Sequence, residues 1–235
     1  MQWDGEGLLI GVRRHGETSV IAEVMVAEKG RTLGLVRGGR SSKLAATLQP
    51  GNTVQVSWRA RIEEHLGTFA VELIDARAAD LIVDRIRLYA CQLLCDHLRL
   101  LPERDPHDRL LQLAVAALEP KPRHELAVEL ARFELTLLDE LGFGLDLSAC
   151  AVTGATDDLT HVSPKTGRAV SREPAQPYCD RLLVLPQFLL ADAPAEPGDV
   201  ADAFRLTGHF LRMHVWEPRQ IEPPATRDAL IDALV

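Results

Sequence analysis

The sequence predicts an α+β protein: an N-terminal OB-fold β-barrel, then an α-helical domain with a loop-rich excursion that has a degenerate zinc-finger-like outline. Two observations predict this fold. Apolar residues alternate with polar ones through the first 79 residues, which is the period of strands. From Ala79 they recur at three- and four-residue spacing, which is the period of helices. We therefore expect a nucleic-acid-binding domain over residues 1–79 and a helical domain over 80–235, with the excursion at 145–182.

Five short apolar runs are the predicted strands of the barrel. They cover residues 7–13, 19–27, 31–36, 53–60 and 66–74, and a polar turn at 63–65 precedes the last one. Gly30 ends the hairpin turn after the second run, because glycine adopts a positive φ without strain. An SH3-like barrel fits the strand count almost as well. A short helical insert at 44–48 favours the OB fold, which places a helix between its third and fourth strands.

The helical domain is predicted from the apolar period and from proline and glycine breaks. Three helices are expected over about 79–102, 105–118 and 123–141, and the last of them ends at Gly142 and Gly144. Residues 145–182 lose the period and contain turn residues, so we expect a loop-rich or short-hairpin excursion there. A final amphipathic helix is expected from about 199 to 215. These helices have enough apolar surface to bury a core of their own.

Charge is unevenly distributed in a chain whose net charge is -8. Residues 1–79 hold ten Lys and Arg against nine Asp and Glu, and the remainder holds sixteen against twenty-five. The N-terminal part is therefore the better candidate for contact with an anion. Neither a signal-peptide pattern nor an apolar run of about 18 residues is present, so we expect a cytoplasmic protein with no membrane partner. The four cysteines fit a reducing compartment.

The run Arg-Gly-Gly-Arg-Ser-Ser-Lys at 37–43 is the most cationic local segment. Glycines let backbone amides approach an anion while guanidinium groups grip its oxygens. An ordinary solvated surface loop is the alternative interpretation. Its place between the third strand and the short helix favours a phosphate path on the barrel. The candidate DNA-binding residues are Arg13, Arg14, Arg31, Arg37, Arg40, Lys43, Arg59 and Arg61.

No catalytic motif is present, so the sequence predicts a protein that is not an enzyme and has no catalytic residues. It contains no phosphate-binding glycine fingerprint, nucleophile elbow or His-Glu-x-x-His pair. Cys150 and Thr153-Gly154 have the outline of a zinc knuckle whose second cysteine is threonine. Tetrahedral zinc takes four ligands, and Cys179 with His161 would leave the set one short. We therefore expect no metal and no cofactor.

Three runs together resemble the RecO family of bacterial recombination mediators. They are Gly7 through Glu17-Thr18-Ser19 to Gly30-Arg31; Arg37-Gly38-Gly39-Arg40 leading to Leu48-Gln49-Pro50-Gly51; and Arg132-Phe133-Glu134-Leu135 with Leu137-Leu138, Leu141-Gly142-Phe143 and Cys150. The resemblance covers most of the chain and keeps the order of its parts. The family often has four zinc-binding cysteines in the excursion, and this sequence departs from that pattern at Thr153 and around residues 167–171.

The resemblance implies a DNA repair and recombination mediator near the nucleoid. Such a protein binds single- and double-stranded DNA and the C-terminal tail of single-stranded DNA-binding protein (SSB). It anneals complementary strands and, with RecR, helps RecA to replace SSB on gapped DNA. By resemblance, Arg132 and Phe133 are the candidate SSB-tail-binding residues, although Arg132 also suits a salt bridge within its own helix. A scaffold that binds only protein or structured RNA is the alternative function.

Overall fold

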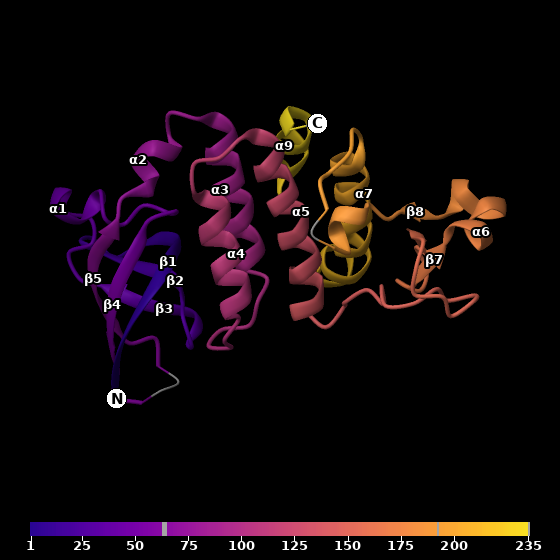
Figure 1. The fold of residues 1–235 in the computed structure, drawn as a ribbon. Coiled ribbons are helices and arrows are strands. Elements are labelled where there is room, and N and C mark those ends of the chain that lie inside the picture. The colour runs from indigo at the N-terminus through magenta and orange to yellow at the C-terminus, as the bar shows by residue number, and fades with distance from the viewer. Residues whose placement is uncertain (63–64, 192, 235) are drawn as a thin grey trace. The chain divides into compact units, whose positions relative to one another are not determined.

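The computed structural model describes residues 1–62, 65–191 and 193–234, and the chain divides into two units, Met1–Pro120 and Lys121–Val235 (Figure 1). Residues 63 and 64 of the predicted polar turn lie outside the described residues. No helix among the described residues is long and apolar enough to cross a membrane.

The first unit begins with a closed five-stranded barrel, which confirms the predicted OB-type fold. Its strands are β1 (Gln2–His15), β2 (Ser19–Val26), β3 (Gly30–Val36), β4 (Thr53–Arg59) and β5 (Thr68–Asp75), and the short helix α1 (Ser42–Ala45) lies between β3 and β4. The strand order is β1-β2-β3-β5-β4, with β1 also paired to β4. Strands β3 and β5 pair in parallel, through Leu35 and Thr68. Alternate side chains such as Leu9, Val24 and Val56 fill the interior.

Strand β1 is longer than the sequence pattern predicts. It starts at Gln2, and the register pairs Trp3 with Trp58 and Asp4 with Ser57 of β4. Asp4 and Glu6 made this segment look too polar for a strand, but these side chains alternate with Trp3 and Gly5. The N-terminal half of β1 is therefore a regular strand that pairs with β4. This extension brings a second tryptophan onto the barrel.

The predicted turn at Gly30 is confirmed, and its glycine has a steric reason. Gly30 has a φ of +68°, and a Cβ there would lie 1.9 Å from the carbonyl oxygen of Asp105. Any other residue would combine an unfavourable backbone conformation with a clash against that backbone. The β2–β3 turn therefore packs directly against the backbone of Asp105, in the segment between the helices α3 (Arg85–Leu98) and α4 (Asp108–Leu118).

Three helices complete the first unit: α2 (Arg77–Leu81), α3 (Arg85–Leu98) and α4 (Asp108–Leu118). The sequence predicts one helix over 79–102, but Asp84 interrupts it. The carboxylate of Asp84 accepts hydrogen bonds from the backbone N–H groups of Ile86 and Arg87, which starts α3 as a new helix. The helices α2, α3 and α4 belong with the barrel in the first compact unit, and that unit ends at Pro120. The domain boundary near Ala79, where strands give way to helices, stays a prediction.

The second unit is built on α5 (Arg123–Glu140), which packs against α7 (Asp199–Leu211) and α9 (Ala225–Leu234) (Figure 1). The last predicted helix continues through a π-helical turn, η3 (Arg212–Trp216), into α8 (Glu217–Arg219). Gly142, with a φ of +84°, ends α5 as predicted.

The excursion contains a short hairpin, one of the two expected alternatives, because β6 (Leu159–Val162) and β7 (Ala169–Ser171) pair antiparallel. Strand β8 (Leu183–Val184), directly after the excursion, completes a three-stranded sheet in the order β7-β6-β8. Three short helical segments accompany it: α6 (Arg172–Ala175), η1 (Gln176–Arg181) and η2 (Gln187–Leu189). The strands of two to four residues are too short for the apolar period to reveal them.

Candidate functional site

The cationic loop at 37–43 lies against the β1–β2 turn. The backbone N–H of Arg40 donates to the carbonyl oxygen of Thr18 at 3.1 Å, and its Nη1 donates to that of Glu17. A hollow of about 390 Å³ lies here, lined by Glu17, Thr18, Gly38, Arg40 and Ser41. Gly38 has a φ of +65°, so glycine allows the loop to turn back onto the β1–β2 turn.

Five of the eight predicted DNA-binding cations lie on these two loops or beside them. They are Arg13, Arg14, Arg37, Arg40 and Lys43, here called the turn cluster, and all five are exposed. Arg13 and Arg14 are consecutive in β1, so their side chains point to opposite faces of the ladder. The turn cluster therefore surrounds one end of the barrel and does not form a single row. It can hold phosphates by charge alone.

Arg59 and Arg61 lie at the other end of β1. Arg59 pairs with Gln2 at the start of that strand, whereas His15 at its end pairs with Ser19 beside the turn cluster. A strand of 14 residues is roughly 40 Å along the chain. In Figure 1 the N-terminus and α1 accordingly lie at opposite ends of the barrel. The structure thus separates the predicted cations into two groups.

Arg31 belongs to neither group, and the structure argues against it as a phosphate contact. Its Nη1 pairs with Oε1 of Glu23, and its Nε donates to the carbonyl oxygen of Leu101 at 2.9 Å. Only 16% of its side chain is exposed. Arg99 pairs with the other oxygen of Glu23 at 3.0 Å, so both arginines tie the barrel to the C-terminal end of α3. Sequence alone cannot separate such a structural arginine from a surface one.

Asn52 is a supporting residue that the sequence pattern does not single out. It is 1% exposed, and its Nδ2 donates to the carbonyl oxygens of Ala46 and Thr47, while its Oδ1 accepts from the N–H of Ala78. These bonds fix the chain that follows α1 against the start of α2. Asn52 therefore positions α1 and the loop before it. Its place after Pro50-Gly51 is the only sequence signal for this role.

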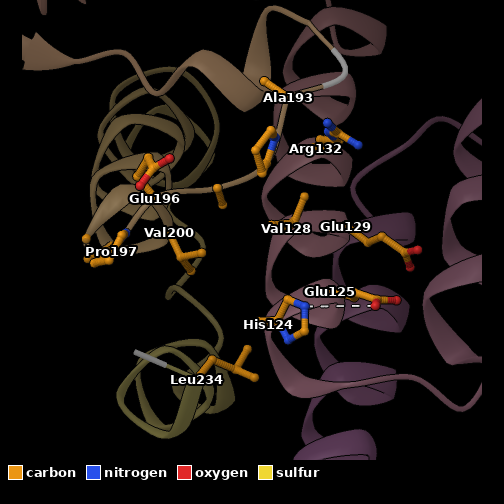
Figure 2. A pocket seen from close by; sticks show the side chains of 14 residues that line it. His124, Glu125, Val128, Glu129, Arg132, Ala193, Glu196, Pro197, Val200 and Leu234 are labelled. Carbon is orange, nitrogen blue, oxygen red and sulfur yellow. Dashed lines mark ion pairs between the residues drawn. The ribbon is translucent and has the colours of Figure 1, made fainter.

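Arg132 lies on α5 at one end of a pocket of about 690 Å³ (Figure 2). Its Nε and Nη2 donate to the carbonyl oxygen of Phe188 at 3.1 and 2.9 Å, and Nη2 also lies 3.3 Å from that of Ala191. The guanidinium stands over the ring of Phe188 at 5.9 Å. Arg132 is therefore held in place by the η2 segment while its side chain still lines the pocket.

Phe133 corrects one expectation, because it is 1% exposed. A side chain of α5 that is buried in the hydrophobic core cannot contact a peptide at the surface. Arg132 faces the pocket and Phe133 faces the core, because consecutive residues on a helix point in directions about 100° apart. Phe133 is therefore a core residue and not a contact residue.

The pocket walls are apolar and its charges are mixed. Val128 of α5, Val200 of α7 and Leu234 of α9 contribute apolar side chains, with a proline- and alanine-containing loop over 193–198. In Figure 2, Arg132 lies near Ala193 at one end, and Leu234 lies at the other end near His124. His124 is 3.9 Å from the carboxylate of its neighbour Glu125. An apolar groove with a fixed cation at one end suits an apolar peptide with a terminal carboxylate.

The residues of the zinc-like knuckle do not fit a tetrahedral metal. Cys150 is buried, and its Sγ accepts a hydrogen bond from the N–H of Ser171 at 3.3 Å. Burial raises the pKa of Cys150, but hydrogen bonds from Ser171 and Thr153 outweigh it and lower that pKa to about 6. Cys179 is exposed and donates to the carbonyl oxygen of Ala175. Across the part of the chain that the structure describes, no group of three His, Cys, Asp or Glu residues is placed to hold a metal.

Two family models match this chain. The model described as Recombination protein O N terminal matches residues 1–77, and the model described as Recombination protein O C terminal matches residues 83–220. Three similar proteins are each described as DNA repair protein RecO. The protein from Mesorhizobium japonicum is 53% identical over 100% of this chain and 94% of its own length. The protein from Chelativorans sp. is 51% identical over 100% of this chain and 96% of its own length. The protein from Rhizobium etli (strain ATCC 51251) is 52% identical over 99% of this chain and 92% of its own length.

Proposed function

The chain belongs to the RecO family of DNA repair and recombination proteins, and we propose that in this role it binds single- and double-stranded DNA and anneals complementary strands. A RecO protein is a recombination mediator and not an enzyme, so the prediction that this protein is not an enzyme is confirmed by its family. The expectation that it lacks a metal or cofactor remains a prediction.

The turn cluster is the observation that carries the DNA-binding proposal. Five exposed cations surround two adjoining loops in a chain whose net charge is -8. Contacts between these cations and phosphates release counterions, which gives an affinity that falls with salt and is independent of base sequence. Such a grip leaves the base edges accessible, and annealing requires accessible base edges. Arg59 and Arg61, at the other end of β1, supply a second and separate point of contact.

The pocket at Arg132 supports the proposed binding of the SSB tail. That tail is acidic and apolar and ends in a free carboxylate, which matches an apolar groove with an arginine at one end. Docking of this tail would bring SSB-coated DNA to a protein that also holds bare DNA. The proposed cooperation with RecR and, through it, with RecA is supported by family membership alone.

A strand-annealing assay with oligonucleotides coated by SSB tests the function. We expect this protein to accelerate annealing of coated strands, and we expect SSB without its tail to abolish that acceleration. Naked strands serve as the control, because their annealing needs the barrel but not the tail pocket. If neither naked nor coated strands anneal faster, the protein is the alternative scaffold that binds only protein or structured RNA.

A further inference from the structure

A second hollow lies on the barrel, away from the turn cluster. It holds about 200 Å³ and is lined by Trp3, Glu28, Lys29, Thr32, Trp58 and Arg104. Trp3 follows Gln2, which pairs with Arg59, so the hollow lies at the end of the barrel that carries the second group of cations. Two indoles, two cations, a carboxylate and a hydroxyl therefore meet in one small depression.

The two indoles of the hollow are stacked and one of them is fixed. The rings of Trp3 and Trp58 have centroids 5.7 Å apart and planes 15° apart. Trp58 is 2% exposed, and its Nε1 donates to the carbonyl oxygen of Leu66 at 3.1 Å. Trp3 is only partly buried, and its ring meets Phe69 edge to face at 6.2 Å. Trp3 is thus a flat aromatic surface supported from beneath by a rigid neighbour.

The two cations of the hollow, Arg104 and Lys29, lie on turns of the backbone. Arg104 stands over the ring of Trp58 at 5.8 Å, and its Nη2 donates to the carbonyl oxygen of His65 at 2.7 Å. Arg104 has a φ of +62°, a conformation that few non-glycine residues adopt. Lys29 comes from the β2–β3 turn, where Glu28 also has a positive φ and its N–H donates to Asp108. Three of the lining side chains therefore come from two tightly held turns.

We infer that this hollow is a nucleobase-binding site for single-stranded DNA, with Trp3 as the stacking surface. Bases stack on exposed aromatic rings whatever their identity, and arginine and lysine beside the ring can contact the flanking phosphates. The carboxylate of Glu28 can accept hydrogen bonds from a base edge. A planar polar heterocycle suits this lining better than an aliphatic side chain does. The inference rests on the proposed DNA binding and adds a base contact to it.

The experiment compares two oligonucleotides of equal length on the full-length protein: one of thymidines, and one made of abasic sites that keeps only the sugar–phosphate chain. We expect the base-bearing strand to bind more tightly. Trp3→Ala should weaken binding of that strand by about 5- to 150-fold while leaving binding of the abasic strand unchanged. Tyr178→Ala, which removes an exposed aromatic side chain from the other unit, is the matched control and should change neither affinity.

Trp3 also packs against the barrel core, so a second substitution guards against loss of fold. Trp3→Leu retains an apolar side chain against Trp58 and Phe69 but removes the flat ring, and its thermal unfolding verifies the barrel. It should abolish the preference for the base-bearing strand. An equal preference in Trp3→Leu and in the unmodified protein would overturn the inference, as would equal binding of both strands by the unmodified protein. If the unmodified protein binds neither strand, the proposed DNA binding itself fails.

Intrinsic fluorescence gives an independent readout, because the chain has only three tryptophans, at 3, 58 and 216. A base stacked on Trp3 should quench its emission, and the abasic strand should not. Trp216 is 2% exposed in the other unit and provides a constant background. Quenching by the thymidine strand that persists in Trp3→Leu would place the stacked base elsewhere and overturn the inference.

Discussion

Arg227 of α9 donates from Nε and Nη2 to the two carboxylate oxygens of Glu134 of α5, each at 2.8 Å. Nη2 of Arg227 also donates to the carbonyl oxygen of Phe204, and the hydroxyl of Thr207 donates to Glu134. Burial lowers the pKa of Arg227, but the adjacent Glu134 outweighs it and raises that pKa. Three helices of the second unit therefore share one buried, charged centre.

Removing one member of this pair should destabilise the second unit. Arg227→Met leaves the fully buried carboxylate of Glu134 without its cation, which costs about 3–5 kcal/mol in the free energy of unfolding. Replacing both members, as Glu134→Leu with Arg227→Met, should cost less than either single change. Urea unfolding followed by circular dichroism measures all three. A double variant less stable than both single variants would contradict this account.

Arg37→Ala with Arg40→Ala should weaken DNA binding and reduce its salt dependence. Each lost phosphate contact lowers the slope of log affinity against log salt by about 0.7 for single strands, so the pair should lower it by about 1.4. Arg205→Ala removes an exposed arginine of the other unit and is the matched control. Titrations at several salt concentrations, followed by fluorescence anisotropy, give the slopes. An unchanged slope in the double variant would remove the turn cluster from the DNA path.

Arg31→Ala should affect the stability of the protein and not its binding of DNA. Because Arg31 already pairs with Glu23 and donates to Leu101, its loss should lower the midpoint of thermal unfolding and leave the salt slope unchanged. The same titrations and a melting curve test both expectations. A lower slope with an unaltered melting temperature would return Arg31 to the set of DNA contacts.

Arg132→Ala should weaken binding of a labelled SSB tail peptide by about 10- to 150-fold, the range expected for one hydrogen-bonded charge pair. Arg123→Ala, an exposed arginine at the start of the same helix that does not line the pocket, is the control. A peptide amidated at its C-terminus should bind the unmodified protein weakly and show no further loss with Arg132→Ala. Further loss with the amidated peptide would mean that Arg132 does not hold the carboxylate.

Dialysis against a chelator should leave thermal unfolding unchanged and release no stoichiometric zinc. The reason is that Cys150 is held by hydrogen bonds from Ser171 and Thr153, while Cys179 is exposed on a separate segment. Elemental analysis of the purified protein and melting curves before and after dialysis measure this. One zinc ion per chain, or a lower melting temperature after dialysis, would disprove it.

The free energy of unfolding should depend on pH through Cys150. Its pKa is about 6 in the folded protein and 9.0 ordinarily, so between these values the unfolded chain binds more protons than the folded one. Stability therefore rises as pH increases from about 6 to 9, is fully present above 9, and is lost as pH falls through 6. Cys150→Ser should flatten this part of the profile. Equal slopes in the two proteins between pH 6 and 9 would refute a folded-state thiolate.

The barrel was predictable because its strands alternate and its turns contain glycine. The period of two placed β2, β3 and β4 within a residue or two, and the insert before β4 favoured the correct barrel class. The start of β1 was missed because Asp4 and Glu6 are the outward members of its alternation. The break between α2 and α3 was missed because Asp84 acts through a cap, which does not alter the apolar period.

The candidate sites were less predictable, since they depend on long-range contacts. Sequence identified the cations of the barrel but could not show that Arg31 pairs with Glu23 or that β1 separates Arg59 from the turn cluster. The family resemblance proposed Arg132 and Phe133 together, although Arg132 lines the pocket and Phe133 is buried. The pair Glu134–Arg227 joins residues 93 positions apart, and no local pattern indicates it.

That separation also sets an order of events during synthesis. The barrel finds all its strand partners within the first 75 residues, so it can close while later segments are still on the ribosome. The charge of Glu134 is neutralised only after the 93 residues up to Arg227 have been synthesised. Until then the incomplete helical bundle cannot bury this carboxylate. Protease resistance in nascent chains should therefore arise first in the barrel, and resistance of α5 that precedes the synthesis of α9 would contradict this order.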